Sequence, residues 1–126
     1  MKRDMELVRK ILFAVEDQGA TPIDWIDEFL IEGYADEAVG YHVWMLAQAG
    51  FLEAINLSTL GGFSYAPRCL TWQGAELLDA IRDPEVWRRT KSGAATVGGA
   101  GVEFLWELAK VYAKQVIKER LGVDLT

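Results

Sequence analysis

Paired carboxylates are the first residues in this chain of 126 that could do chemistry, since two carboxyl groups can exchange protons with a substrate or hold a metal ion. Such groups occur at Asp24, Asp27 and Glu28, and again at Asp36 and Glu37. Their spacing is that of exposed helix faces, and no metal-ligating partners accompany them. We interpret these carboxylates as solvated surface, and we predict no catalytic site and no metal site.

Cys69 and His42 are the only cysteine and the only histidine of the chain. One of each cannot assemble the usual structural zinc site, and a lone cysteine cannot form an internal disulfide, which is consistent with a reducing compartment. Cys69 lies in an expected strand beside Leu70, so a buried, inert thiol is expected rather than a nucleophile. Residues 98–101 are rich in glycine but lack the Gly-Lys-Ser/Thr of a phosphate loop and the preceding strand of a dinucleotide turn. We therefore expect no cofactor and no enzyme activity.

A second group of residues is suited to binding DNA or a partner protein, and it consists of Tyr41, His42, Met45, Gln48, Arg68, Arg88, Arg89 and Lys91. A helix that reads DNA presents Arg, Lys, Asn or Gln to base edges in the major groove. Here His42 and Gln48 could read bases, and Tyr41 could contact a phosphate. The same helix could instead form a protein-interaction surface or simply pack, with His42 as a structural or surface residue.

The basic members of this group lie later in the chain. Arg68, on the second strand of an expected hairpin, is the best placed basic residue for a phosphate or minor-groove contact. Arg88, Arg89 and Lys91 form the densest basic cluster, next to Trp87. This cluster could be a flexible arm that tracks a nucleic-acid backbone, or equally the polar face of a short helix.

The net charge of −6 is distributed unevenly along the chain. Residues 1–50 hold four basic and ten acidic residues, whereas residues 83–126 hold seven basic and six acidic ones. An acidic front half repels phosphate and disfavours nonspecific duplex binding, whose affinity comes largely from neutralising phosphates with lysine and arginine. The charge therefore argues against the commonest ligand of a DNA-reading helix.

The elements that must position these residues follow from apolar spacing and from capping residues. Helices are predicted over residues 3–17, 22–30, 36–49, 73–82 and 85–91. Thr21 as N-cap and Pro22 at the first helical position indicate the second of these helices.

Two strands are predicted over residues 51–57 and 63–72, paired across a Gly-Gly turn. A helix stopped by Gly50, then a strand, a turn, a second strand and a further helix is the order of a winged helix. The predicted fold is therefore α+β and mainly helical, a winged helix-turn-helix with a two-stranded wing.

The end of the chain differs in composition. Residues 92–101 are small and glycine-rich, which predicts a linker between a winged-helix domain of residues 1–91 and an appended C-terminal helix of residues 102–121. Apolar residues on several faces of that helix indicate packing against more than its own core, such as a symmetry mate. The expected dimerisation stripe is Leu105, Leu108, Tyr112 and Val116. We predict a packing or dimerisation helix and a possible homodimer.

Several separated motifs follow one another along the chain: residues 1–9, Tyr41-His42, residues 49–52, residues 70–74, and residues 80–83 with Val86-Trp87. In this order they resemble a family of short bacterial and phage proteins known only as a domain of unknown function. The resemblance covers residues 1–121, and it implies a winged-helix fold in a phage or prophage setting. It implies no activity.

No apolar run approaches the roughly 20 residues needed to span a bilayer, so we expect a cytosolic protein without membrane association. Together the patterns predict a small phage-type regulatory protein, most directly a winged-helix DNA-binding transcriptional regulator. The alternative is an acidic protein-interaction module that does not bind DNA, including one that imitates nucleic acid or inhibits a host enzyme. The expected partner is therefore DNA or a protein.

Overall fold

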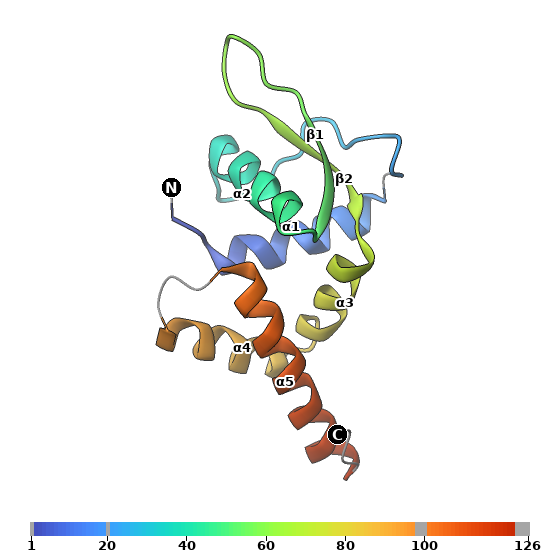
Figure 1. Cartoon of the computed structure of the whole chain (residues 1–126), viewed down its shortest axis with the longest axis vertical. Coiled ribbons are helices and arrows are strands. Elements are labelled where there is room, and N and C mark those ends of the chain that lie inside the picture. Colours follow the sequence, from blue (N-terminus) through green and yellow to red (C-terminus); the bar gives the residue numbers. More distant parts are fainter. Residues whose placement is uncertain (1, 20, 98–100, 123–126) are drawn as a thin grey trace. The chain divides into compact units, whose positions relative to one another are not determined.

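A computed structural model describes residues 2–19, 21–97 and 101–122 of the chain (Figure 1). The described residues form five α-helices and one two-stranded antiparallel sheet, so the protein is α+β and mainly helical. The chain divides into two compact units, Met1–Ala75 and Glu76–Thr126. Over the described residues, every helix is too short or too polar to span a lipid bilayer.

The first unit contains α1 (Met5–Gln18), α2 (Asp36–Gln48), β1 (Leu52–Asn56), β2 (Tyr65–Leu70) and the start of α3 (Trp72–Ile81). α1 begins at Asp4, whose carboxylate accepts the backbone N–H groups of Glu6 and Leu7. It ends at Gly19, whose φ of 62° lies in the left-handed region that glycine adopts without strain. The predicted first helix is confirmed, and its buried face packs against α2 and β2.

Residues 21–34 form turns, and the helix predicted to begin at Pro22 is wrong. In a helix, the Pro22 carbonyl would accept the N–H of Ile26. That N–H donates instead to the Pro67 carbonyl of β2 at 2.9 Å, and the Pro22 carbonyl accepts from Arg68 at 3.3 Å. Hydrogen bonds to β2 therefore replace those of a helical turn, and tertiary contacts override the local helix signal.

β1 and β2 form the predicted hairpin between two helices. They are antiparallel, with Leu52 opposite Leu70, and the tip is bridged between Thr59 and Gly62. The loop of the hairpin extends beyond the paired strands (Figure 1). β1 and β2 both contact α2, so the hairpin packs against this helix.

A close-packed joint connects the end of α2 to the start of α3. The Thr71 hydroxyl donates to the Gly50 carbonyl at 2.6 Å and accepts the Gly74 N–H at 3.1 Å. The backbone N–H of Thr71 donates to the Phe51 carbonyl at 3.3 Å. Gly74 lies so near this carbonyl that an added Cβ would be 1.9 Å from its oxygen. Only glycine fits at this point of α3.

The second unit contains the rest of α3, then α4 (Pro84–Val97) and α5 (Val102–Leu121), and the last two helices pack against each other. Asp83 caps α4, because its carboxylate accepts the N–H groups of Glu85 and Val86. Pro84 stands at the first helical position, where no N–H is needed. A new helix therefore begins after Asp83, which confirms the interruption between the predicted helices over 73–82 and 85–91.

α4 continues through residues 92–97, so the linker predicted over 92–101 is wrong for this part. Its small residues serve helix packing. A Cβ at Gly93 would lie 3.0 Å from the Tyr112 hydroxyl and 3.3 Å from Leu108, so the glycine lets α5 approach closely. Residues 98–100 of the predicted linker lie outside the described residues.

Thr90 on α4 has a buried hydroxyl group with no hydrogen-bond partner in the described structure, at 0% exposure. An unsatisfied buried hydroxyl costs about 1–3 kcal/mol. Thr90→Val removes this cost at nearly constant shape, and we expect it to stabilise the protein by about 1 kcal/mol. The corresponding rise in Tm, measured by circular dichroism, is about 3 °C.

Thr96→Val is the matched control on the same helix. The Thr96 hydroxyl is exposed and donates to the Ser92 carbonyl at 3.0 Å, so its loss should leave Tm nearly unchanged or slightly lower. If the Thr90→Val protein melts at a lower temperature than the wild type, the Thr90 hydroxyl of the wild type has a hydrogen-bond partner, and the prediction is wrong.

Candidate functional site

His42 lies in the interior at 1% exposure, so it does not face outward from α2, and the alternative interpretation of a structural histidine is confirmed. Its Nε2 accepts the Asp4 backbone N–H at 2.8 Å, and its Nδ1 lies 2.7 Å from the Ala38 carbonyl oxygen. Because a backbone N–H can only donate, Nε2 carries no hydrogen, and Nδ1 carries the one donated to Ala38. His42 is a neutral structural residue that joins the start of α1 to α2, and it does not read a base.

Tyr41, Met45 and Gln48 lie on α2 as predicted, but of the three only Gln48 is exposed, and the other two are partly buried. Tyr41 packs against Trp44 with ring centroids 5.6 Å apart. α2 contains no lysine and no arginine. Its C-terminal half therefore offers Gln48 to a partner and no cation to a phosphate.

Arg68 lies on β2 as predicted, but its guanidinium is engaged with its own chain. It donates to the carbonyls of Pro22 and Asp24 at 3.3 and 3.2 Å. It also lies 5.8 Å from the centroid of the Trp25 ring. The structure thus gives Arg68 a role in holding residues 21–34 against β2, and its phosphate contact stays a prediction.

Arg88, Arg89 and Lys91 lie on α4, so the interpretation of this cluster as a flexible arm is wrong and that of a helix face is confirmed. Arg88 pairs with Glu85 at 2.6 Å, and Arg89 pairs with Glu85 and with Glu119 of α5, both at 2.8 Å. Hydrogen bonds from Arg88 and Arg89 lower the pKa of Glu85 to about 2. Hydrogen bonds to Glu119 and Glu85 raise the pKa of Arg89. The charge of both arginines is compensated within the second unit.

Half of the predicted dimerisation stripe is buried within its own chain. Leu105 and Val116 are 0% and 3% exposed. Leu108 and Tyr112 lie against Gly93 of α4. Leu105 and Val116 are thus not open to a second copy of the chain, whereas Leu108 and Tyr112 are partly exposed. Dimerisation through this stripe stays a prediction.

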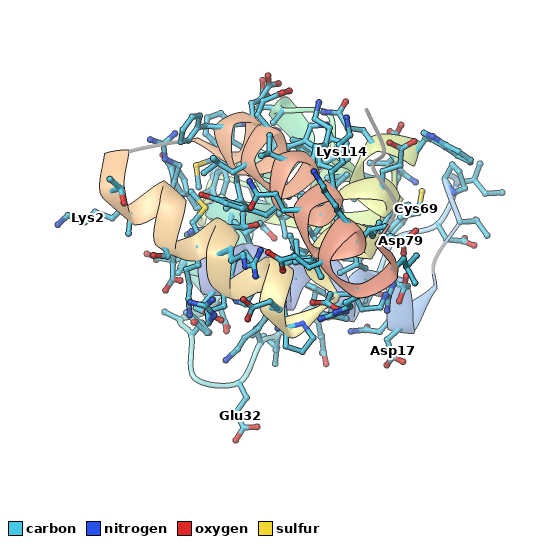
Figure 2. All side chains as sticks on the ribbon, turned by 90° about the horizontal axis from the view of Figure 1, so that it is seen from below. Lys2, Asp17, Glu32, Cys69, Asp79 and Lys114 are labelled. Carbon is cyan, nitrogen blue, oxygen red and sulfur yellow. The ribbon has the colours of Figure 1, made fainter. Side chains whose placement is uncertain are left out.

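Cys69, labelled in Figure 2, is half-buried on β2. Burial raises the pKa of its thiol, and the nearby charge of Glu53 adds to this effect. A raised thiol pKa lowers the fraction of reactive thiolate, as expected for an inert cysteine. Across the residues that the structure describes, no three His, Cys, Asp or Glu side chains are placed to hold a metal ion.

The feature that sequence reasoning missed is a cleft of about 240 Å³ in the first unit, between residues 26–30, the start of α2 and the hairpin. Apolar and aromatic side chains line it: Ile26, Phe29, Leu30, Leu57, Phe63 and Tyr65. Four carboxylates complete its lining: Asp27, Glu28, Asp36 and Glu37. Four of the five carboxylates interpreted as solvated surface are exposed, as expected, and also border this cleft.

The carboxylates of this cleft have no basic partner among the described residues. Asp27 accepts a hydrogen bond from the Trp25 indole N–H at 2.8 Å, which is a neutral donor. Asp36 and Glu37 stand in the first turn of α2, where the positive helix end offsets only about half a charge. The cleft is therefore strongly negative.

A sequence signal could have found this site. Between Lys10 and Arg68 the chain contains nine acidic residues and no lysine or arginine. α2 and the whole hairpin loop fall inside this stretch. Glu32, in the loop before α2, and Asp17, at the end of α1, extend away from the ribbon (Figure 2).

The acidic stretch also exposes large apolar side chains. They are between 37% and 110% exposed: Ile23, Trp25, Leu30, Leu57, Leu60 and Phe63. All come from the loop before α2 or from the hairpin. Leu30, Leu57 and Phe63 of this set line the cleft together, and grouped apolar side chains on a charged surface are typical of a site that binds another molecule.

The motifs on which the family resemblance rests contact one another and hold the fold together. The start of the chain meets Tyr41-His42 through the hydrogen bond from Asp4 to His42. Residues 49–52 meet residues 70–74 at Thr71 and Gly74. These motifs therefore indicate the fold and do not indicate a ligand.

The comparisons with known proteins agree with this resemblance. Residues 2–101 match the model of a family described as "Hypothetical protein (DUF2513)". The chain is 36% identical over 122 residues to an "Uncharacterized protein" of Haemophilus influenzae, and the match covers 97% of this chain and 100% of that protein. No solved structure matches the chain. The chain therefore belongs to the DUF2513 family of hypothetical proteins.

Proposed function

We propose that this protein is a small regulatory binding protein of winged-helix type whose first unit docks on a protein partner and does not bind DNA. One observation carries the proposal: α2 and the hairpin loop contain no lysine or arginine. In a winged helix these are the elements that approach a duplex. Duplex affinity depends on cations that neutralise phosphates, so the surface that would face DNA is of the wrong charge.

The distribution of charge between the two units supports the same conclusion. Residues 1–75 hold five basic and eleven acidic side chains, a net charge of −6, whereas residues 76–126 hold eight of each. The whole net charge of the chain therefore belongs to the first unit. Such a surface attracts a basic partner and accelerates its association.

The exposed apolar side chains of the loop and hairpin support a protein partner. Protein interfaces combine buried apolar anchors with a polar rim. The partner class that fits is a basic protein, and a host nucleic-acid enzyme whose DNA-binding surface the acidic unit would occupy belongs to this class. A phage or prophage setting is part of this proposal.

A DNA-binding transcriptional regulator is the second candidate. The order α2, β1, β2, α3 supports it, because a winged helix places its recognition helix, wing and next helix in this order. Gln48 is exposed on α2 and is of a type that reads adenine. The expected ligand in this case is the DNA upstream of the protein's own coding region.

Binding to duplex DNA separates the two candidates. We expect the full chain to show no saturable binding to mixed-sequence duplex or to its own upstream region, measured by fluorescence anisotropy at several low salt concentrations. Nonspecific DNA-binding proteins bind with Kd of about 10⁻⁴ to 10⁻⁶ M at physiological salt and more tightly at lower salt. Tight binding that weakens steeply with salt, and is stronger on the upstream DNA, would overturn the proposal.

The positive arm is capture of a partner on the immobilised full chain from a bacterial lysate, with identification by mass spectrometry. We expect a basic protein that elutes as salt rises, because the attraction is electrostatic. Direct binding of the purified partner, with a Kd measured by calorimetry, is the required confirmation.

A further inference from the structure

We infer that the acidic cleft between residues 26–30, α2 and the hairpin is the docking site for an arginine side chain in a basic segment of the partner. This inference rests on the proposed function and names the site through which it acts. The cleft combines a negative rim, aromatic walls and the volume of one long side chain.

The aromatic wall is shaped for a planar cation. The rings of Phe63 and Tyr65 lie with centroids 5.2 Å apart and planes tilted by 30°. Phe63 is 49% exposed, so part of its ring is open to a ligand. Gly40 of α2 lies beside it without a side chain, and a Cβ there would be 3.6 Å from the Phe63 ring. A guanidinium can stack on such a ring while its stem crosses apolar surface.

The carboxylates supply the acceptors that this cation needs. Glu28 and Glu37 both line the cleft, one from the loop and one from α2, and neither has a basic partner among the described residues. A guanidinium carries five N–H donors in a fixed plane and can bond two carboxylates while it stacks. A lysine ammonium is a more strongly hydrated point charge and gains less from the rings.

The charge of the cleft argues against other ligand classes. A helix N-terminus usually attracts an anion, but Asp36 and Glu37 already occupy the first turn of α2. The volume of about 240 Å³ is below the range of about 300–1,000 Å³ typical of drug-sized ligand and cofactor pockets. A single cationic side chain matches both the charge and the size.

The first unit already holds one of its own arginines in this way. Arg68 lies over the Trp25 ring at 5.8 Å and donates to two carbonyls of the same loop. This internal pair shows that an aromatic ring together with oxygen acceptors can seat a guanidinium on this unit. The cleft offers a second site of this kind for a guanidinium, in which carboxylates take the place of the carbonyls.

The test uses a blocked octapeptide of alternating glycine and arginine, added to the ¹⁵N-labelled full chain. The same peptide with citrulline in place of arginine is the ligand control, because citrulline keeps the shape and loses the charge. We expect the arginine peptide to shift the backbone resonances of Gly40, Phe63 and Tyr65. The citrulline peptide should leave them in place.

Two matched double variants locate the site. Glu28→Gln with Glu37→Gln removes two charges from the cleft, whereas Asp17→Asn with Glu53→Gln removes two charges elsewhere on the first unit. We expect at least about tenfold weaker binding of the arginine peptide to the first variant and less than about twofold to the second. Phe63→Ala, which removes a half-exposed ring, should also weaken binding while the chain stays folded.

The outcomes separate this inference from the proposed function. Equal weakening in the two double variants would overturn the cleft as the site and leave a diffuse acidic attraction in agreement with the proposed function. Absence of arginine-peptide binding at low salt would overturn the cleft, whereas the duplex and partner measurements decide the proposed function independently.

Discussion

Gly74→Ala is expected to prevent stable folding of the first unit. The added Cβ would lie 1.9 Å from the Phe51 carbonyl oxygen and 2.9 Å from its carbon, and both are backbone atoms that cannot rotate away. α3 would have to move, and the hydrogen bonds of Thr71 to Gly50 and Phe51 would break with it. We expect a loss of more than about 4 kcal/mol, a large part of the 5–15 kcal/mol that stabilises typical domains. Urea unfolding followed by circular dichroism measures it.

Gly40→Ala is the matched control, because Gly40 is also a helical glycine of the first unit. Its added Cβ would meet the Phe63 ring at 3.6 Å, an ordinary contact. Alanine is favoured over glycine in helices by about 1 kcal/mol, so this variant should be equally stable or more stable. Similar unfolding midpoints for Gly74→Ala, Gly40→Ala and the wild type would contradict the close packing at the α3 joint.

The elements with local signals could be predicted from the sequence. α1 shows apolar residues at spacings of three and four and ends at a glycine, and the hairpin lies between Gly50 and a strong helix start. These signals act within a few residues, so local rules describe them. Thr71 and Asp83, both in front of helices, have the type and position of caps.

The loop of residues 21–34 could not be predicted, because its structure is decided by residues far along the chain. Arg68 and Pro67 bind its backbone groups across more than forty positions. Glu28 adopts a positive φ of 51°, a conformation that few non-glycine residues take. Residues 26–30 of this irregular loop line the cleft, so the cleft could not be predicted either.

The candidate binding residues were predicted from their residue types. Residue type alone does not determine which groups a side chain contacts in the folded protein. His42 and Arg68 are suited to nucleic acid, yet their polar atoms bind Asp4, Ala38 and the 21–34 loop. Net charge is a signal of another kind, because it is a sum over many residues and does not depend on one side-chain contact. The acidic front half of the chain argues against DNA whichever side chains its folding buries.

His42 gives the second large effect, because two backbone groups depend on its ring. Without the imidazole, the Asp4 N–H and the Ala38 carbonyl lose their partners, and a cavity opens at a position that is 1% exposed. An unpaired buried polar group costs about 1–3 kcal/mol, and cavity formation adds to it. We expect His42→Ala to destabilise the protein by about 3 kcal/mol, measured by urea unfolding.

Two amide variants divide this effect between the two ring nitrogens. The Asn side chain can place an N–H near the Nδ1 position, so His42→Asn should retain the bond to Ala38 and lose the one to Asp4. The longer Gln side chain can place an oxygen near the Nε2 position, so His42→Gln should retain the acceptor for Asp4. We expect both to be more stable than His42→Ala. ¹⁵N NMR of the wild-type imidazole should show hydrogen on Nδ1 and none on Nε2. A hydrogen on Nε2 would contradict the link between α1 and α2, since the Asp4 N–H would then face a second donor.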